Sequence, residues 1–382
     1  MPIIKKIKDI NVVLVIDSLD GGGAEHQALM LASGLCDEGF KVTIFPLRGD
    51  GQLTEKAKKL NLTIVEGGLK SKRDIKSFIL GFILLCKTIR SLNPTIVHTY
   101  LPFSNFLGSF AGRLSGASFI ITSRRGLIKQ NYLKKRWRYI DRLSNFFSNK
   151  ISVNTLSIKK EMEQVDSANP NKIICIRNGI DLNKFKIDKM VRSQVRSSLC
   201  LTEDQFAWVK VANLSNIKGH EDLIKGFKNI DDKYQSKLFF VGKDRGTLSR
   251  LRKLVSSLNL ENKIKFLGFQ EDIPKILSAM DGFICVSHSE GLSNAILEAM
   301  AMKLPIIATN VGGNPEILEE QKYGILIEPK SQKDIYNSMT RLMDDKGLRA
   351  KLSNACIEGV TNKYSKESMV NSYIDLYESG LK

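Results

Sequence analysis

Short apolar runs alternate with amphipathic stretches along most of this chain, and no other feature constrains its fold more strongly. The run Asn11–Asp17 has the composition of a buried strand, and Ala24–Glu38 then places apolar residues at helical spacing. Repeated strand–helix alternation predicts a parallel sheet covered by helices on both faces. In sheets of that kind, ligands bind beyond the carboxyl ends of the strands.

The alternation is interrupted once, which indicates two domains. Residues 186–204 are polar and basic without a strand pattern, whereas alternation resumes at Phe206 and residues 331–382 show only helical patterns. A chain of 382 residues is also too long for one ordinary domain. We therefore predict an α/β fold of two Rossmann-like domains, an N-terminal domain over residues 1–185 and a C-terminal domain over residues 186–361.

The stretch Ser287–Gly313 reads as a strand end, a glycine turn, a helix, a buried strand and a second glycine turn. A helix that begins near Asn294 points its free backbone N–H groups back at the turn, where an anion can bind. Glu290 precedes this helix and Glu298 lies just over one turn inside it, so both carboxylates can accept hydrogen bonds from sugar hydroxyls. The pattern indicates nucleotide-sugar binding, and an ordinary capped helix with two solvated glutamates is the alternative.

Three other segments carry candidate site residues, each with a plainer alternative. Gly21–Gly23 follow the first predicted strand, where glycines let the backbone approach a phosphate closely, unless they form a plain loop. Lys218 follows a later predicted strand and either reaches a diphosphate or is a surface lysine. Asn213, ahead of it, is a phosphate contact or a turn residue. His98, at a strand end, is a site residue or a satisfied core residue.

The charge indicates an anionic partner, because 58 Lys and Arg against 40 Asp and Glu give a net charge of +18. Two basic segments with apolar residues, 70–90 and 124–142, suit an anionic membrane surface. The alternatives are a nucleic-acid site and a solvated helix face. Since no nucleic-acid recognition motif accompanies the basic residues, we expect no nucleic-acid partner.

No run approaches the roughly 18–20 apolar residues that a spanning helix needs. The first ten residues are too short and too charged for a secretory signal. We therefore predict a cytoplasmic protein that associates peripherally with the inner face of the plasma membrane.

Four segments carry a resemblance to a known enzyme family: GGGAEHQALMLASGL (21–35), IRNGIDLNKF (176–185), NLSNIKGHEDLIKGF (213–227) and EGLSNAILEAMAMKLPIIATNVGGNPEIL (290–318). With them the chain resembles the retaining glycosyltransferases of family four, including members that build bacterial surface polysaccharides. The last segment is the most specific, because its two glutamates are separated by seven residues as in the family signature. The resemblance implies the GT-B fold, in which two Rossmann-like domains face each other across a cleft. It also implies that the final helix, about residues 362–382, packs back on the first domain.

The resemblance implies roles for individual residues as well. Glu290 would contact hydroxyls of the donor sugar, Glu298 would hold the ribose hydroxyls, and Lys218 would bind the diphosphate. Backbone groups of two glycine-containing segments would complete the donor site, namely those of Gly291, Leu292, Ser293 and Asn294, and those of Gly22 and Gly23.

The chain departs from the family pattern at two places. The arginine that family members commonly carry five residues before the lysine is Asn213 here, so one charge contact to the diphosphate is missing or supplied elsewhere. Many members carry a histidine after the fifth strand, where this chain reads Thr122–Ser123–Arg124. Arg124 or His98 is expected to stand in for it. The predicted catalytic residues are therefore Glu290, Lys218, His98 and Arg124.

These features predict an enzyme that moves a hexose or N-acetylhexosamine from a nucleoside diphosphate sugar, a UDP-sugar by resemblance, to a saccharide or polyprenyl-linked acceptor. We expect retention of anomeric configuration and a role in O-antigen or capsule synthesis. No D-x-D triplet is present, so we expect no metal and no cofactor besides the nucleotide sugar as co-substrate. The alternatives are a nucleotide-sugar epimerase of the same architecture and an inactive, membrane-docked partner of a glycan-assembly complex.

Overall fold

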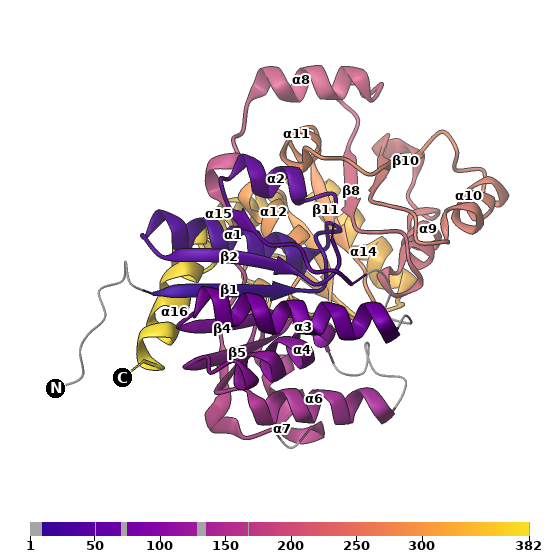
Figure 1. The fold of residues 1–382 in the computed structure, drawn as a ribbon. Coiled ribbons are helices and arrows are strands. Elements are labelled where there is room, and N and C mark those ends of the chain that lie inside the picture. The colour runs from indigo at the N-terminus through magenta and orange to yellow at the C-terminus, as the bar shows by residue number, and fades with distance from the viewer. Residues whose placement is uncertain (1–9, 50, 70–74, 128–134, 167, 382) are drawn as a thin grey trace. The chain divides into compact units, whose positions relative to one another are not determined.

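The computed structural model describes residues 10–49, 51–69, 75–127, 135–166 and 168–381, with residues 75 and 135–137 described by their backbone alone. The chain divides into two compact units, one of residues 1–179 with 366–382 and one of residues 180–365 (Figure 1). The first division falls a few residues before the predicted boundary at 185, and the second falls a few residues after the predicted boundary at 361.

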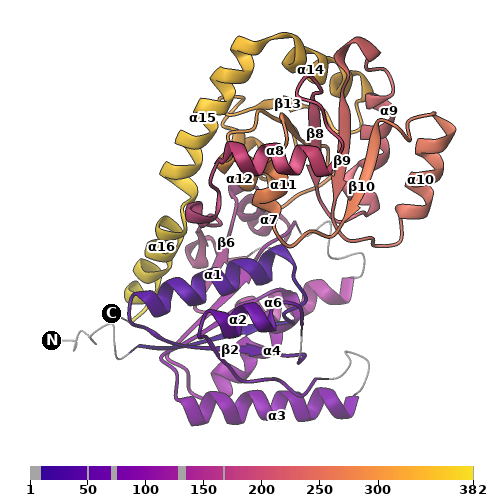
Figure 2. The same ribbon diagram turned by 90° about the horizontal axis from the view of Figure 1, so that it is seen from above.

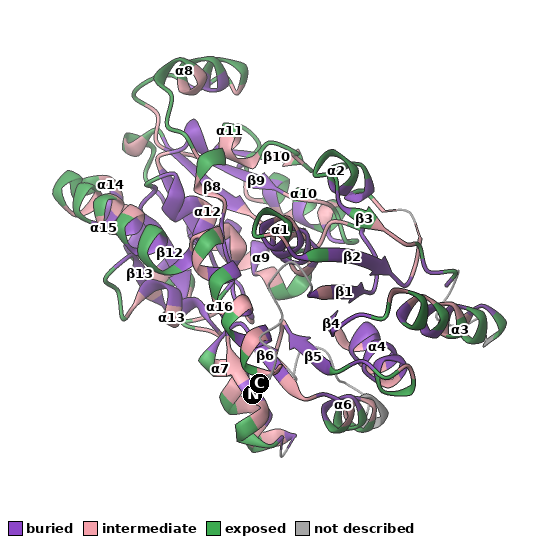
Figure 3. Cartoon of the chain, turned by 60° about the vertical axis from the view of Figure 1, so that its left-hand side comes forward, coloured by how far each residue is buried: buried purple, intermediate pink, exposed green. Residues whose placement is uncertain are grey.

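The first unit is built on a seven-stranded parallel sheet in the order β3-β2-β1-β4-β5-β6-β7. Central strands such as β1 and β4 are buried on both faces (Figure 3), as continuous apolar runs predict. The strands are β1 (Asn11–Ile16), β2 (Lys41–Pro46), β3 (Thr63–Ile64), β4 (Ile96–Tyr100), β5 (Phe119–Arg124), β6 (Lys150–Val153) and β7 (Ile173–Cys175).

Helices cover both faces of this first sheet. One apolar cluster joins it to α1 and α16, and a second joins it to α3 and α4. The C-terminal helix α16 lies against α1 closely enough that a Cβ at Gly34 would meet Val370 Cγ2 at 2.3 Å. The helices of the unit are α1 (Gly23–Asp37), α2 (Thr54–Lys59), α3 (Ile75–Leu92), α4 (Pro102–Leu114), α6 (Lys135–Phe147), α7 (Leu156–Val165) and α16 (Lys366–Ser379).

The second unit is built on a six-stranded parallel sheet in the order β10-β9-β8-β11-β12-β13. The strands are β8 (Ala207–Val211), β9 (Lys237–Val241), β10 (Ile264–Gly268), β11 (Gly282–Cys285), β12 (Ile306–Thr309) and β13 (Ile325–Ile327). One apolar cluster joins the sheet to α8, α11, α12 and α15, and another joins it to α9, α10 and α14. Figure 2 shows these helices around the strands of the second sheet.

The helices of the second unit are α8 (Lys189–Ser198), α9 (His220–Phe227), α10 (Leu248–Ser257), α11 (Ile273–Ser278), α12 (Asn294–Ala301), α13 (Asn314–Leu318), α14 (Gln332–Asp344) and α15 (Lys346–Tyr364). Together the two sheets confirm the predicted α/β class with two Rossmann-like domains. None of the described helices is long and apolar enough to cross a membrane.

The strand order places one topological switch point in each sheet. It lies between β1 and β4 in the first unit and between β8 and β11 in the second, because successive connections run to opposite sides there. Loops that leave the carboxyl ends of such neighbouring strands diverge and open a crevice, where α/β proteins bind their ligands. The loops after β8 and β11 carry the predicted residues Lys218 and Glu290.

Candidate active site

Lys218 and Glu290 meet at the switch point of the second sheet. Lys218 Nζ donates a hydrogen bond to Glu290 Oε1 over 2.6 Å, and the two side chains are largely buried. The backbones of their loops are also joined, because His288 N donates to Ile217 O over 2.8 Å. The structure thus brings together two residues that lie 72 positions apart in the sequence.

A second hydrogen bond fixes the same carboxylate oxygen of Glu290. Ser287 Oγ donates to Glu290 Oε1 over 2.7 Å, and Ser287 is held in turn by Thr309 Oγ1, which donates to Ser287 O over 2.6 Å. The thiol of Cys285 lies 4.0 Å from the same oxygen. Sequence reasoning missed Ser287 and Thr309, although each follows directly at or after the end of a predicted strand, where site residues gather.

Helix α12 begins directly after this carboxylate. Ser293 is its N-cap residue in an extended conformation, and its side chain makes no capping hydrogen bond. Gly291, Leu292 and Ser293 are buried, and Glu298 is half-buried in the second turn. Because the first turn of a helix presents backbone N–H groups without intrahelical acceptors, this end of α12 suits an anion.

Two glycines hold the loops of the site at backbone contact distance. Gly312, after β12, has φ +55°, and a Cβ there would lie 1.8 Å from Glu290 O. Gly219, after Lys218, has φ +68°, and its Cβ would lie 1.9 Å from Val286 O. Neither position accepts a side chain without displacing a loop that carries a site residue.

Asn213 acts as a turn residue in this structure. Its Oδ1 accepts a hydrogen bond from Lys243 N over 3.1 Å and so links the loops after β8 and β9. The Lys243 ammonium lies over the ring of Phe269 at 4.6 Å from the ring centroid, and half of Phe269 is exposed. The carboxyl edge of the sheet therefore offers a cation and an aromatic ring that the sequence analysis did not single out.

The glycine loop of the first unit is occupied by a carboxyl group. Gly22 is the N-cap of α1, and Gly23 is the first residue of the helix. The buried Glu25 side chain folds back so that a Cβ at Gly22 would lie 2.3 Å from Glu25 Oε2. Burial raises the pKa of this carboxyl. A phosphate at the predicted place would require Glu25 to move or to be protonated.

His98 lies in the core of the first unit, not at a ligand-accessible surface. It is fully buried in β4, with Nδ1 2.7 Å from Tyr377 Oη and Nε2 2.7 Å from Ser123 Oγ. Burial lowers the pKa of the imidazole, and the Arg125 charge lowers it further. Both ring nitrogens are hydrogen-bonded inside the core, an arrangement that favours a structural role for His98 over the predicted catalytic one.

Arg124 also points into the protein. It forms a buried ion pair with Asp141 on α6 and donates to Asn145 Oδ1 over 3.2 Å, which leaves it no access to a ligand. This placement gives no support to the catalytic role predicted for Arg124. Successive side chains at a strand end point to opposite faces of the sheet, so the Arg125 side chain points away from the side on which Arg124 meets Asp141. It donates to Asn178 Oδ1 over 3.0 Å and to Tyr373 Oη over 2.5 Å.

Two family models match the chain in succession: the model described as Glycosyltransferase Family 4 matches residues 21–184, and the model described as Glycosyl transferases group 1 matches residues 191–358. The chain belongs to glycosyltransferase family 4. It is therefore a transferase, as the sequence analysis predicts, and the second match contains the whole constellation around Lys218 and Glu290.

Two curated relatives of this glycosyltransferase match over most of their length. The UDP-Gal:alpha-D-GlcNAc-diphosphoundecaprenol alpha-1,3-galactosyltransferase of Escherichia coli is 27% identical over 312 residues, which cover 80% of this chain and 79% of the relative. The capsular polysaccharide biosynthesis glycosyltransferase CapM of Staphylococcus aureus is 25% identical over 319 residues, which cover 81% of this chain and 82% of the relative.

Among solved structures, Anabaena Alr3699/HepE in complex with UDP and glucose superimposes with a TM-score of 0.89 at 19% identity. The match covers 97% of this chain and 100% of the Anabaena chain. At this identity the likeness shows the fold alone, and it confirms the predicted GT-B fold.

Two buried nitrogen-bearing side chains of the glycosyltransferase lie close to the site and were missed in the sequence. Lys210 is fully buried in β8, and burial lowers the pKa of its ammonium group. The nearby Cys285 and Glu290 side chains act in the opposite direction and raise this pKa, but burial has the larger effect. His220, the first residue of α9, packs its ring on Phe240, the register partner of Lys210. Within the described residues, neither Lys210 Nζ nor the two ring nitrogens of His220 have a hydrogen-bond partner. The signal for Lys210 was a single lysine inside an otherwise apolar strand.

The buried His220 predicts a stability loss of the second unit at mildly acidic pH. Burial, aided by the Lys210 charge, lowers the pKa of His220 to about 2. Below the ordinary pKa of about 6.5 the unfolded chain binds a proton that the folded chain rejects. The free energy of unfolding should therefore fall by about 1.4 kcal/mol per pH unit between pH 6 and pH 4 from this group.

Urea titrations read by tryptophan fluorescence measure this slope. Trp208 is buried in the second unit, so a Trp137→Phe background restricts the signal to that unit. His220→Phe keeps an aromatic ring on Phe240 without a titrating group, and its slope should be shallower. Equal slopes for His220→Phe and its parent would show that this imidazole does not carry the effect.

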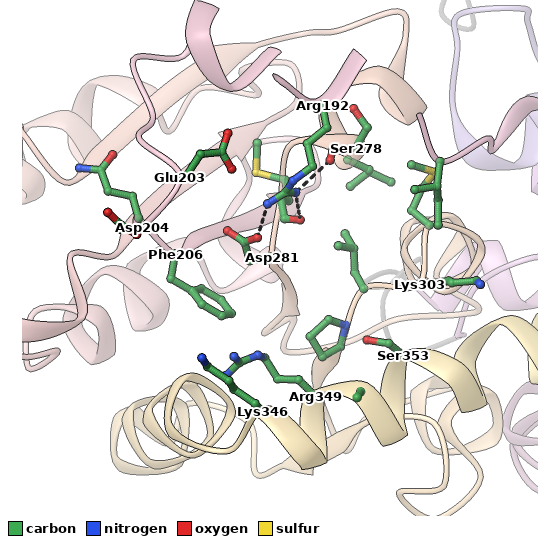
Figure 4. Close-up of a pocket in the computed structure, with 18 residues that line it drawn as sticks. Arg192, Glu203, Asp204, Phe206, Ser278, Asp281, Lys303, Lys346, Arg349 and Ser353 are labelled. Carbon is green, nitrogen blue, oxygen red and sulfur yellow. Dashed lines mark hydrogen bonds and ion pairs between the residues drawn. The ribbon is translucent and has the colours of Figure 1, made fainter. Parts of the chain in front are cut away.

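A cavity of about 690 Å³ lies at the opposite, amino edge of the second sheet. Phe206, Asp281 and Pro305, which directly precede β8, β11 and β12, contribute to its lining. Arg192 is fixed against Asp281 at 2.6 Å, with further hydrogen bonds to main-chain carbonyls such as Ser278 O (Figure 4). Because nucleotides bind at the carboxyl edge of such sheets, we do not assign this cavity to the donor.

Within the described residues, no group of three or more His, Cys, Asp or Glu side chains is arranged to hold a metal ion.

Proposed function

We propose that this glycosyltransferase moves a hexose or N-acetylhexosamine from a UDP-sugar to a saccharide or lipid-linked saccharide, with retained anomeric configuration. The observation that carries the proposal is the Lys218–Glu290 pair just ahead of α12 at the switch point of the second sheet. The relatives support it, because the E. coli relative is named for UDP-galactose and a diphosphoundecaprenol-linked acceptor, and CapM is named for capsular polysaccharide biosynthesis. We place the reaction in O-antigen or capsule synthesis on the same grounds.

In this proposal the donor diphosphate lies at the amino end of α12. Lys218 supplies a positive charge and the helix start supplies backbone N–H groups, while Glu290 accepts hydrogen bonds from the sugar and Glu298 from the ribose. The remaining proposed donor contacts in the second unit are the backbones of Gly291, Leu292, Ser293 and Asn294. An ammonium has three N–H donors, so Lys218 can donate to the diphosphate while it keeps its hydrogen bond to Glu290.

Bond cleavage makes the diphosphate more negative and the sugar ring more positive. Groups that are already oriented stabilise that charge separation most strongly, because they need not reorganise during the reaction. Glu290, with one oxygen fixed by Lys218 and Ser287, is oriented in this way. We propose that the departing phosphate takes the proton of the acceptor hydroxyl on the face that it leaves, which accounts for retention without a protein nucleophile.

The proposed partners follow from this chemistry. They are the nucleotide-sugar donor, a saccharide or polyprenyl-linked acceptor, and an anionic membrane surface at the cytoplasmic face, with no role for nucleic acid. The proposal includes no metal and no cofactor besides the co-substrate.

Calorimetric titration with UDP-, GDP- and dTDP-sugars tests the donor, and we expect binding of a UDP-sugar. Incubation with that donor alone should leave it unchanged, and addition of the acceptor should yield an α-linked product from an α-linked donor. Isomerisation of the donor without acceptor would identify an epimerase. Failure of every nucleotide sugar to bind would favour the inactive membrane-docked partner.

A further inference from the structure

Three neighbouring helices of the first unit, α3, α4 and α6, form a layer, and large apolar side chains of α3 and α6 are exposed on it. α4 lies between α3 and α6, and a row of aromatic rings joins them: Phe82 stacks on Phe110 at 5.5 Å, and Phe110 contacts Phe147 at 5.3 Å. Exposed turns follow one another along α3 and α6 (Figure 3). We name the outer surface of these two helices the α3–α6 face and define it by its exposed apolar side chains: Ile79, Leu80, Ile83, Tyr139, Leu143 and Phe146.

The apolar residues of this face recur at helical spacing on the solvent side of α3 and α6. They are not core residues that are only partly covered. Leu80 is 65% exposed and Phe146 is 75% exposed, while Leu85 and Ile89 on the same α3 helix are fully buried. Helix α3 therefore has one apolar stripe toward its own sheet and another toward solvent, whereas the exposed apolar residues of α6 lie opposite the buried polar side chains of Asp141, Ser144 and Asn145. A stripe that does not pack inside the protein marks a surface that meets something apolar.

The charges around these stripes have one sign. Exposed cations flank the apolar residues, namely Lys76, Lys87 and Arg90 on α3 and Arg142 on α6. The sequences of α3, α4 and α6 contain a single acidic residue, Asp141, and it is buried in its ion pair with Arg124. The face thus combines insertable apolar side chains with cations and without exposed carboxylates.

We propose that the α3–α6 face docks on an anionic phospholipid surface, with the six apolar side chains in the headgroup–acyl boundary and the four cations at the headgroups. Apolar burial and attraction to anionic lipid act together at such surfaces. A second copy of the chain fits less well, because a symmetric contact would bring the same cations together. Nucleic acid is a less suitable partner, because its binding is dominated by contacts with charged phosphates, which would not cover the exposed aliphatic side chains of the α3–α6 face. The inference rests on the membrane partner of the proposed function and not on its transfer chemistry.

Co-sedimentation of the full chain with vesicles tests the proposal. We expect binding to phosphatidylglycerol-containing vesicles, little binding to pure phosphatidylcholine, and release at high salt. Lys87→Gln and Arg142→Gln should each weaken binding about fivefold, since one cation near an anionic surface contributes about that factor. Phe146→Glu should weaken binding at least about tenfold, because it loses an apolar anchor and gains a repelled charge.

Met190→Glu is the matched control, because Met190 is 73% exposed, lies on α8 of the second unit, and undergoes the same charge change. It should bind vesicles like the parent. Absence of binding to anionic vesicles at low salt, or an equal loss in Met190→Glu and Phe146→Glu, would overturn the proposal. A change of oligomeric state in Phe146→Glu with unchanged vesicle binding would overturn it in favour of a contact between copies. Binding of UDP-sugar in solution should be the same in all variants, so failure here is distinguishable from failure of the proposed function.

Discussion

Glu290→Gln should lower the turnover of sugar transfer by at least about 100-fold, which is the size of effect that removal of one preoriented charge-stabilising group has in other enzymes. The carboxylate is held by Lys218 and Ser287 before any ligand arrives, so it stabilises a developing positive ring without reorganisation. The amide of glutamine has nearly the same shape but no negative charge. The loss should therefore appear in kcat more than in KM.

Steady-state kinetics with the donor identified by calorimetry measure this effect. Glu261→Gln is the matched control, because Glu261 lies exposed on the surface of the same unit, where it accepts a hydrogen bond from Ser256 Oγ over 2.6 Å. It should retain full turnover. Near-parental kcat in Glu290→Gln, with the control also active, would remove Glu290 from the mechanism.

Lys218→Met should lower kcat/KM by at least about 100-fold and weaken the binding of UDP itself about tenfold or more, since a charge-assisted hydrogen bond is worth roughly 1.5–3 kcal/mol. Methionine keeps the length and apolar stem of lysine but removes the cation that faces the diphosphate. Calorimetry with UDP separates this loss of nucleotide binding from the loss in turnover.

Lys225→Met provides the control, because Lys225 forms an ion pair of the same kind with Glu221 over 2.8 Å and lies on α9 away from Glu290. It should leave UDP binding unchanged. Because Lys218 and Glu290 are hydrogen-bonded, we expect the double variant to lose less than the product of the single effects. Strictly additive losses, or unchanged UDP affinity in Lys218→Met, would contradict the assigned pair.

The sequence predicted the parts of this structure that depend on local composition. Continuous apolar runs located β1 and β9, because a strand in a parallel sheet is buried on both faces and must be apolar throughout. The glycine turn and the helical stretch after it located the start of α12, and the switch point then brought Lys218 to Glu290. These predictions need only the period of the pattern and the topology of the fold.

The sequence did not reveal elements in which a polar side chain turns inward. Residues 186–204, described only as polar and without a strand pattern, contain α8, because Arg196 is buried against Asp281 and main-chain carbonyls and Asp188 caps the helix. Composition cannot distinguish such a buried, fully bonded arginine from a solvated one.

The same limit applies to the arginines at the end of β5 in the first unit. Arg124 was a candidate for catalysis, but its direction at the end of β5 sends it to Asp141, whereas Arg125 turns to Asn178 and Tyr373. The partner Tyr373 lies 248 positions away, on a helix whose place in the first unit no local pattern specifies. Part of the predicted basic segments, residues 70–74 and 128–134 with Tyr132 among them, lies outside the described residues.

A crystal structure with UDP bound tests the central claim most directly, namely that the diphosphate of the donor binds at the amino end of α12. We predict the diphosphate on the backbone of Gly291 to Asn294 with Lys218 Nζ within hydrogen-bond distance, and the ribose hydroxyls at Glu298. A nucleotide bound away from α12, for example in the cavity at the amino edge of the sheet beside Phe206 and Asp281, would contradict it.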